Sequence, residues 1–123
     1  MIDYDNTAGF NKKNEPALVA AYTVDNPEKQ RQCIAYSLDK GRTFTKYEGN
    51  PVIDSKAKWN SKDTRDPKVF WYAPGKHWVM VLNERDGHSI YNSADLKNWE
   101  YKSHVTGFWE CPELFELPVD GDK

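Results

Sequence analysis

The sequence alternates short β-branched and aromatic runs with polar segments rich in Asp, Asn, Gly and Pro, a pattern that excludes most folds. Runs of this composition predict β-strands, because their side chains suit a pleated surface and the residues between them favour turns. No segment has a convincing helical pattern, and the best candidate, 55–62, is short and polar. We therefore expect an all-β sandwich, barrel or propeller with strands over residues 16–24, 32–37, 44–47, 68–72, 77–82, 89–93, 99–102 and 113–117.

A weak internal repeat favours the propeller. Ser37 and Ser93 lie 56 positions apart, and each ends an apolar run, precedes an Asp two residues on and is followed by an aromatic residue that opens the next run. Upstream, the runs that contain Leu18 and Trp78 are 60 positions apart. A period in the fifties with about four strands per unit is typical of propeller blades. The chain is predicted to hold about two blades plus the first strand of another.

The turn that begins at Ser37 fits the Asp-box pattern of many propellers. Asp39 can accept hydrogen bonds from turn amides, and Gly41 can adopt a positive φ. Phe44 is expected to pack beneath the hairpin. We interpret Asp39, and Asp95 in the second copy, as structural residues without a catalytic role.

Composition narrows the partners. The 17 Lys and Arg residues nearly balance 19 Asp and Glu, so there is no electrostatic case for a nucleic acid or an anionic membrane as a partner. No apolar run approaches the roughly 18 residues that span a bilayer. The first residues have neither the basic nor the apolar region of a signal peptide. Aromatic residues make up 14% of the chain, which suits both a β-rich core and a sugar-stacking surface.

Cysteine and histidine spacing gives no sign of a metal or cofactor. Cys33 and Cys111 are far apart and lack the spacing of metal ligands, so we expect two free thiols. His77, His88 and His104 are scattered. We expect no cofactor and no bound metal.

The first acidic motif is Thr64-Arg65-Asp66-Pro67, at the entrance of the predicted strand 68–72. Pro67 restricts Asp66 to extended geometry, which would give its carboxylate a defined direction. Arg65 supplies a fork of donors for sugar hydroxyls or a carboxylate. The alternative is a turn Asp beside an ordinary salt-bridging Arg.

The second acidic motif places Glu110 between Trp109 and Cys111, without a polar neighbour on either side. Such a carboxyl is a candidate for desolvation, which would keep its proton available for a leaving-group oxygen. The alternative is a Glu at a strand start that reaches solvent. Together with Asp66, Glu110 would supply the acid and carboxylate that glycoside cleavage needs. Because both lie at the starts of predicted strands one blade apart, we expect them at the same end of a central funnel.

These motifs resemble glycoside hydrolase family 32, the invertases, levanases, inulinases and related β-fructosidases. Residues 64–70 match the family's Arg-Asp-Pro motif, and residues 109–115 match its Glu-Cys motif with the flanking Trp and Pro. Segments 37–52, 76–81 and 93–99 also resemble the family and occur in family order. The resemblance covers essentially the whole chain.

The resemblance implies a five-bladed β-propeller, usually followed by a β-sandwich domain, and a hydrolase that releases fructose from sucrose, levan or inulin with retention. Carried over by position, Glu110 resembles the general acid/base and Asp66 the transition-state stabiliser. Arg65 resembles a residue that contacts the fructosyl hydroxyls, and Cys111 one that tunes the surroundings of Glu110. A fructose-containing saccharide is thus the expected substrate, and a fructan-degrading parent favours a secreted or periplasmic location.

One departure from the family pattern concerns the nucleophile. The family's nucleophile is an Asp in an Asn-Asp-Pro-Asn-Gly motif, which residues 5–9 and 25–27 do not match. We expect residues 1–123 to run from the second blade to the start of the fourth, without the nucleophile-bearing first blade or the C-terminal sandwich. The chain alone is then predicted to be inactive. Two blades also leave strand edges uncovered, which favours self-association.

Two alternatives stay open. One is a non-catalytic carbohydrate-binding or scaffold module built from propeller blades. The other is a different propeller glycosidase, of the arabinanase or xylosidase type, whose motifs match the Glu110 segment less well.

Overall fold

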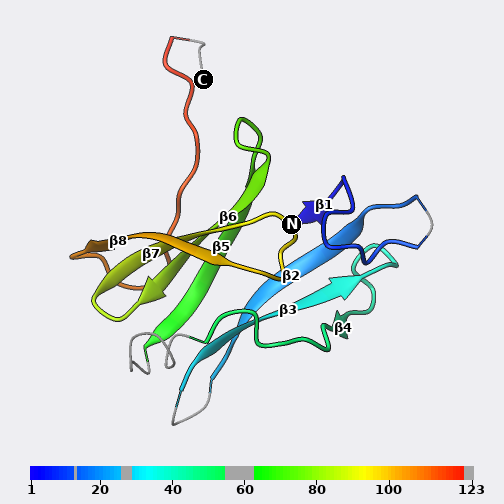
Figure 1. Ribbon diagram of the computed structural model, residues 1–123, viewed down its shortest axis with the longest axis horizontal. Helices are drawn as coiled ribbons and strands as arrows, with labels where there is room; N and C mark the ends of the chain where they lie inside the picture. The colour runs from blue at the N-terminus through cyan, green and yellow to red at the C-terminus, as the bar shows by residue number, and fades with distance from the viewer. Residues whose placement is uncertain (13, 26–28, 55–62, 121–123) are drawn as a thin grey trace.

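The structure, a computed structural model, describes residues 1–12, 14–25, 29–54 and 63–120, in which strands are the only long regular elements (Figure 1). The all-β prediction is confirmed there, while the candidate helix 55–62 lies outside the described residues. The strands are β1 (Ile2–Asp3), β2 (Ala17–Val24), β3 (Arg31–Ser37), β4 (Thr45–Lys46), β5 (Thr64–Tyr72), β6 (His77–Glu84), β7 (Gly87–Ser93) and β8 (Glu100–Thr106).

The strands form two antiparallel four-stranded sheets, β1-β2-β3-β4 and β5-β6-β7-β8, in which every strand pairs with its neighbour in sequence. The predicted repeat is also a repeat of register. Leu18 of β2 lies opposite Ser37 of β3, and Trp78 of β6 lies opposite Ser93 of β7. Each sheet is thus one copy of the repeat unit, which confirms the prediction of two blade-like units.

The main core lies between the two sheets. Ala17, Val19 and Ile34 of the first sheet share a buried cluster with Trp78 and with Leu96, which follows β7. Strands β2 and β5 pack against each other where the sheets meet (Figure 1). Burying these apolar side chains supplies the main stabilisation, because it removes them from water. A second cluster, Ile53, Met80, Leu82 and Tyr91, lies mainly within the second sheet.

Loop residues 7–10 join the core to both sheets. The Phe10 ring stacks on Tyr36 of the first sheet with a centroid distance of 4.0 Å. The indole N–H of Trp78 in the second sheet donates a hydrogen bond of 2.8 Å to Thr7 Oγ1. Asp3 anchors this loop by accepting the amides of Thr7 and Ala8, each at 2.9 Å. The loop therefore contributes to the contact between the sheets.

The two Ser-x-Asp turns have the structural role that the sequence predicts. Asp39 accepts the Thr43 amide at 2.9 Å, and Asp95 accepts the Asn98 amide at 2.8 Å. The prediction for Phe44 is wrong, because its side chain is 50% exposed. The strand that follows Phe44, β4, has only two residues and provides little sheet surface beneath which a ring can pack.

The prediction of a strand over 113–117 is also wrong. The segment that follows β8 joins neither sheet, and Figure 1 draws it as a loop without a strand arrow. A strand needs a neighbour for its backbone hydrogen bonds, and no described segment pairs with residues 113–117. Leu114, Phe115 and Leu117 are exposed there.

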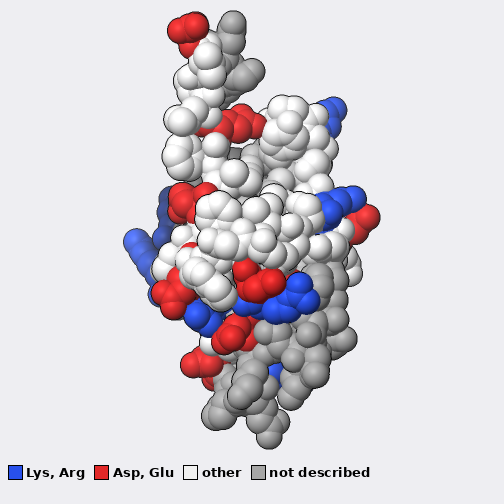
Figure 2. All heavy atoms as spheres, turned by 90° about the vertical axis from the view of Figure 1, so that its left-hand side faces the viewer, with Lys and Arg blue, Asp and Glu red and all other residues white. Residues whose placement is uncertain are grey.

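The surface carries both signs of charge. On the face shown in Figure 2, acidic and basic side chains lie next to one another across the middle of the molecule, and charged side chains are sparser above them. Cys33 and Cys111 are both free, the first buried and the second exposed. The described residues contain no helix with the length and hydrophobicity that a membrane span requires.

Candidate active site

A bulge in β5 positions Arg65 and Asp66. Arg65 pairs with Asn83 of β6, but the register shifts between Arg65 and Lys68, so Asp66 and Pro67 leave the regular ladder. Proline has no N–H to donate to a ladder and is tolerated at such a bulge, which also redirects the neighbouring side chain. The extended geometry expected for Asp66 is wrong: its φ is 61°, in the left-handed region.

Glu110 arrives from the segment after β8 and does not start a strand, so that prediction is wrong. Glu110 and Cys111 have φ angles of 54° and 34°, and the turn they form brings both residues back towards β5 and β6. The Glu110 amide donates a hydrogen bond of 3.0 Å to Asn83 Oδ1. The Glu110 side chain is 66% exposed, so the predicted desolvation is absent from this structure.

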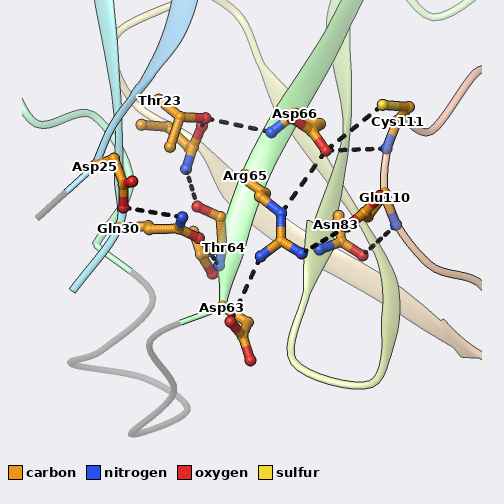
Figure 3. A network of polar contacts seen from close by, with 11 residues as sticks. Thr23, Asp25, Gln30, Asp63, Thr64, Arg65, Asp66, Asn83, Glu110 and Cys111 are labelled. Carbon is orange, nitrogen blue, oxygen red and sulfur yellow. Dashed lines mark hydrogen bonds and ion pairs between the residues drawn. The ribbon is translucent and has the colours of Figure 1, made fainter. Parts of the chain in front are cut away.

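Arg65 is the centre of the charged contacts (Figure 3). Its Nη2 lies 3.2 Å from Glu110 Oε1, its Nη1 lies 3.4 Å from Asp63 Oδ1, and its Nε lies 4.0 Å from Asp66 Oδ2. One guanidinium thus gathers three carboxylates from two distant parts of the chain. The planar guanidinium can contact all three because its N–H donors point in several fixed directions. A lysine ammonium group at this position would act as a single point charge.

Cys111 links the two acidic motifs. Its amide donates a hydrogen bond of 3.0 Å to Asp66 Oδ2, and its sulfur lies 3.8 Å from the same oxygen. The negative charge of Asp66 raises the pKa of the Cys111 thiol, with smaller contributions from desolvation and from the thiol–carboxylate hydrogen bond. A thiol with a raised pKa is a poor nucleophile at neutral pH. The structure therefore favours a supporting role for Cys111.

Neutral side chains from the first sheet support Asp66 from the other side. Thr23 Oγ1 accepts the Asp66 amide at 3.2 Å and donates to Gln32 Oε1 at 2.9 Å. The fully buried Gln32 then donates from Nε2 to the Thr64 carbonyl at 2.8 Å. The two sheets are thus hydrogen-bonded directly beside the site.

All four residues singled out from the sequence, Arg65, Asp66, Glu110 and Cys111, come together in one cluster. Sequence reasoning missed three residues that hold the cluster in place, namely Thr23, Gln32 and Asn83. The available signal was polarity at strand positions that the pattern makes internal, since Gln32 and Asn83 are buried. Among the described residues, no group of three or more His, Cys, Asp or Glu side chains is arranged to hold a metal ion.

The cluster can be compared with known proteins. The sequence model of the glycosyl hydrolases family 32 N-terminal domain matches residues 4–123. The chain belongs to glycoside hydrolase family 32. Its family 32 relatives include the levanase of Bacillus subtilis, which is 54% identical over 129 residues, with 99% of this chain and 19% of the levanase covered. Invertase 1 of Saccharomyces cerevisiae is 44% identical, with 99% of this chain and 24% of the invertase covered.

Solved family 32 structures agree with the fold. The fructofuranosidase of Schwanniomyces occidentalis in complex with fructose superposes with a TM-score of 0.86 at 42% identity, covering 98% of this chain and 25% of that one. The exo-inulinase of Aspergillus awamori gives a TM-score of 0.85 at 37% identity, covering 96% and 28%. The two sheets are therefore two blades of the family 32 β-propeller, and the chain spans about a fifth to a quarter of the length of its curated relatives, 19% and 24% for the two named above.

Proposed function

We propose that these blades belong to the catalytic propeller of a β-fructosidase that cleaves β-fructofuranosidic bonds in sucrose or fructans with retention. The observation that carries the proposal is the convergence of Asp66 and Glu110 on one arginine, with Cys111 bonded to Asp66. Family membership makes this chemistry the one to test, since the relatives are levanases, invertases and inulinases.

Each carboxylate has a distinct proposed role. Glu110 is the general acid/base: its exposed carboxyl can reach a glycosidic oxygen, protonate it and later activate water. Asp66 is the transition-state stabiliser. The Cys111 amide donates a hydrogen bond to Asp66 Oδ2, and the second carboxylate oxygen of Asp66 can accept a hydrogen bond from a fructosyl hydroxyl. That bond strengthens as positive charge develops on the sugar ring.

Arg65 and Cys111 are the proposed substrate-binding residues, Arg65 by direct contact with the sugar and Cys111 by holding Asp66 through its amide. Arg65 spans Asp66 and Glu110, so a fructosyl ring between the two carboxylates meets its guanidinium donors. Retention also needs a nucleophilic carboxylate that forms a glycosyl–enzyme bond. We propose that this group comes from sequence outside these residues, so the 123 residues alone release no fructose.

A chimera tests the proposal without any assumption about flanking sequence. The segment of the Bacillus subtilis levanase that corresponds to this chain is replaced by these 123 residues, and fructose release from sucrose, levan and inulin is measured. We expect activity in the chimera and a loss of about two to four orders of magnitude in its Glu110→Ala variant, which lacks the general acid. The parent levanase and the chimera carrying Asn92→Leu, a change outside the cluster, serve as controls.

The outcomes separate the alternatives. A folded chimera that binds fructans in a calorimeter without cleaving them identifies a carbohydrate-binding propeller, and cleavage of arabinan in place of fructan identifies a glycosidase of the arabinanase type. Either result contradicts the proposed function. Fructose release by the 123-residue chain alone would contradict the proposal that the nucleophile lies elsewhere.

Self-association through uncovered blade surfaces stays a prediction. The exposed apolar side chains that favour it lie on the segment after β8 and include Phe108, Trp109, Leu114, Phe115 and Leu117. Multi-angle light scattering of the 123-residue chain decides this point, because a monomer at all accessible concentrations contradicts it.

A further inference from the structure

Thr23 and Asn83 occupy the same position in the two blades. Thr23 lies five residues after Leu18, whose ladder partner is Ser37, and Asn83 lies five residues after Trp78, whose partner is Ser93. The sequence repeat therefore places both residues at the same point of the second strand of a blade. One copy is a threonine and the other an asparagine, and both side chains end in an oxygen that can accept a hydrogen bond.

Each of these oxygens binds the amide of a proposed catalytic carboxylate. Thr23 Oγ1 accepts the Asp66 amide at 3.2 Å, and Asn83 Oδ1 accepts the Glu110 amide at 3.0 Å (Figure 3). In both cases the carboxylate residue follows the blade that supplies the acceptor: Asp66 comes after the first sheet in sequence, and Glu110 comes after the second. Each blade thus supplies one acceptor oxygen for the carboxylate residue that follows it in sequence.

Both carboxylate residues need such support. Asp66 and Glu110 have φ angles of 61° and 54°, a left-handed region that is unfavourable for a residue with a Cβ. Backbone conformations of this kind persist only when the surrounding contacts hold them. Without the acceptor oxygen the amide would turn towards solvent, and the direction of the carboxyl side chain would change with it.

Glu110 is held at two points by one cross-strand pair. Asn83, which is 1% exposed, lies directly opposite Arg65 in the β5–β6 ladder. Asn83 binds the Glu110 amide, and Arg65 Nη2 lies 3.2 Å from Glu110 Oε1. The main chain and the carboxylate of Glu110 are therefore fixed from neighbouring points of the same sheet.

We propose that Asn83 is the positioning residue for the general acid Glu110, as Thr23 is for Asp66. The inference rests on the proposed function. In each blade, a residue of the second strand then fixes the position of the carboxylate residue that follows the blade in sequence. Asn83 and Thr23 touch no reacting atom, and each acts through the residue whose amide it binds.

The leaving group distinguishes positioning from a general structural role. A sugar alkoxide needs a proton from the acid to depart, whereas a nitrophenolate departs without one. Displacing Glu110 should therefore slow sucrose cleavage far more than cleavage of a nitrophenyl β-fructofuranoside. Displacing Asp66 should slow both, because both reactions pass through the same oxocarbenium-like sugar.

The test compares kcat/KM on the two substrates in the levanase chimera. For Asn83→Leu we expect a loss of up to about 100-fold on sucrose and less than about threefold on the nitrophenyl substrate. Asn83→Asp keeps an acceptor oxygen at the same place and should recover most of the sucrose activity. Thr23→Val should lower both rates by a similar factor, and the control Asn92→Leu should change neither.

Equal losses on both substrates for Asn83→Leu, or no loss on either, would overturn the proposal. If the chimera with Asn83 intact releases no fructose, the proposed function fails, and amide exchange in the 123-residue chain still decides the role of Asn83. Asn83→Leu should speed exchange of the Glu110 amide and leave that of Asp66 unchanged. Unchanged exchange at Glu110 would also overturn the proposal.

Discussion

The two blades share one turn but differ in the aromatic residue and the strand that come after it. In the first, Phe44 after the Asp39 turn is 50% exposed and leads into a strand, β4, of two residues. In the second, Trp99 after the Asp95 turn packs against both core clusters and donates from its indole N–H to the Leu96 carbonyl at 2.9 Å. The next strand, β8, has seven residues. Turn geometry is therefore local, whereas strand length depends on whether the aromatic residue finds a core.

The same contrast holds around the site. The second blade supplies Arg65, Asp66 and Asn83, while the first supplies neutral side chains, among them the amide acceptor Thr23 and its partner Gln32. The longer, better anchored sheet thus carries the charged residues. A rigid support of this kind limits the movement of groups whose positions control reaction rates.

The largest expected effect is on the free energy of unfolding, when the aromatic residue that follows each turn is replaced. Trp99→Ala should lower the free energy of unfolding by about 3 kcal/mol, because it removes a large side chain from both clusters. Phe44→Ala should lower it by less than about 1 kcal/mol, since half of that ring is already in water. Urea denaturation of the 123-residue chain measures both, and equal losses would contradict the difference between the blades.

The next effect concerns a buried carboxylate without a counterpart in the first blade. Glu84 is fully buried and accepts hydrogen bonds from Ser89 at 2.9 Å and from Tyr91 at 2.8 Å, whereas Val24 at the equivalent position is 41% exposed. Tyr91→Phe should lower the free energy of unfolding by about 2 kcal/mol in urea denaturation, because it removes a hydrogen-bond donor from a buried acceptor.

Tyr36→Phe is the matched control for that variant. The Tyr36 ring stacks on Phe10, and this contact survives loss of the hydroxyl. The control should change the free energy of unfolding by less than about 0.5 kcal/mol. A Tyr91→Phe variant as stable as the control would show that Glu84 does not depend on Tyr91.

A smaller effect compares the two Asp turns through pH. Hydrogen bonds from Thr43 and Ser37 hold the pKa of Asp39 well below its usual value of 3.8. For Asp95, burial raises the pKa, but hydrogen bonds from Asn98, Lys97 and Ser93 outweigh it and leave the pKa lowered. A carboxyl whose pKa is lowered by folding stabilises the protein at pH values above its pKa in the unfolded state. That contribution is lost as the pH falls through its pKa in the folded state.

Stability should therefore decline as the pH drops below about 4, the ordinary range of Asp. Asp39→Asn should flatten this decline more than Asp95→Asn, because no comparable burial opposes the hydrogen bonds of Asp39. Thermal unfolding between pH 2 and pH 6, with the exposed Asp5→Asn outside both Ser-x-Asp turns as the control, checks the order. A larger effect at Asp95 would contradict it.

Features that depend on residues close together in sequence could be predicted, whereas features that depend on distant contacts could not. Most of the strands and the Ser37 and Ser93 turns were predictable, because alternation and Asp-turn bonding act over a few residues, whereas the strand expected over 113–117 is absent. The left-handed Asp66 was not, because the rule for residues before proline is local, whereas the bulge depends on the register of β5 against β6. The placement of Glu110 at the start of a strand was wrong for a similar reason, because its turn is held by a contact with Asn83, which is far from it in sequence.

The smallest expected effect concerns the contact between the blades. Lys97 Nζ, from the second blade, lies 4.6 Å from the Phe10 ring centroid and 5.3 Å from that of Tyr47, which the first blade supplies. Lys97→Met keeps the apolar stem and removes the charge, so it should cost about 0.5–1 kcal/mol. Lys76→Met, in the exposed turn between β5 and β6, is the control and should have no measurable effect. If the two variants are equally stable, the ammonium group of Lys97 contributes nothing to the contact between the blades, which then rests on the buried apolar cluster and on the hydrogen bonds between the sheets.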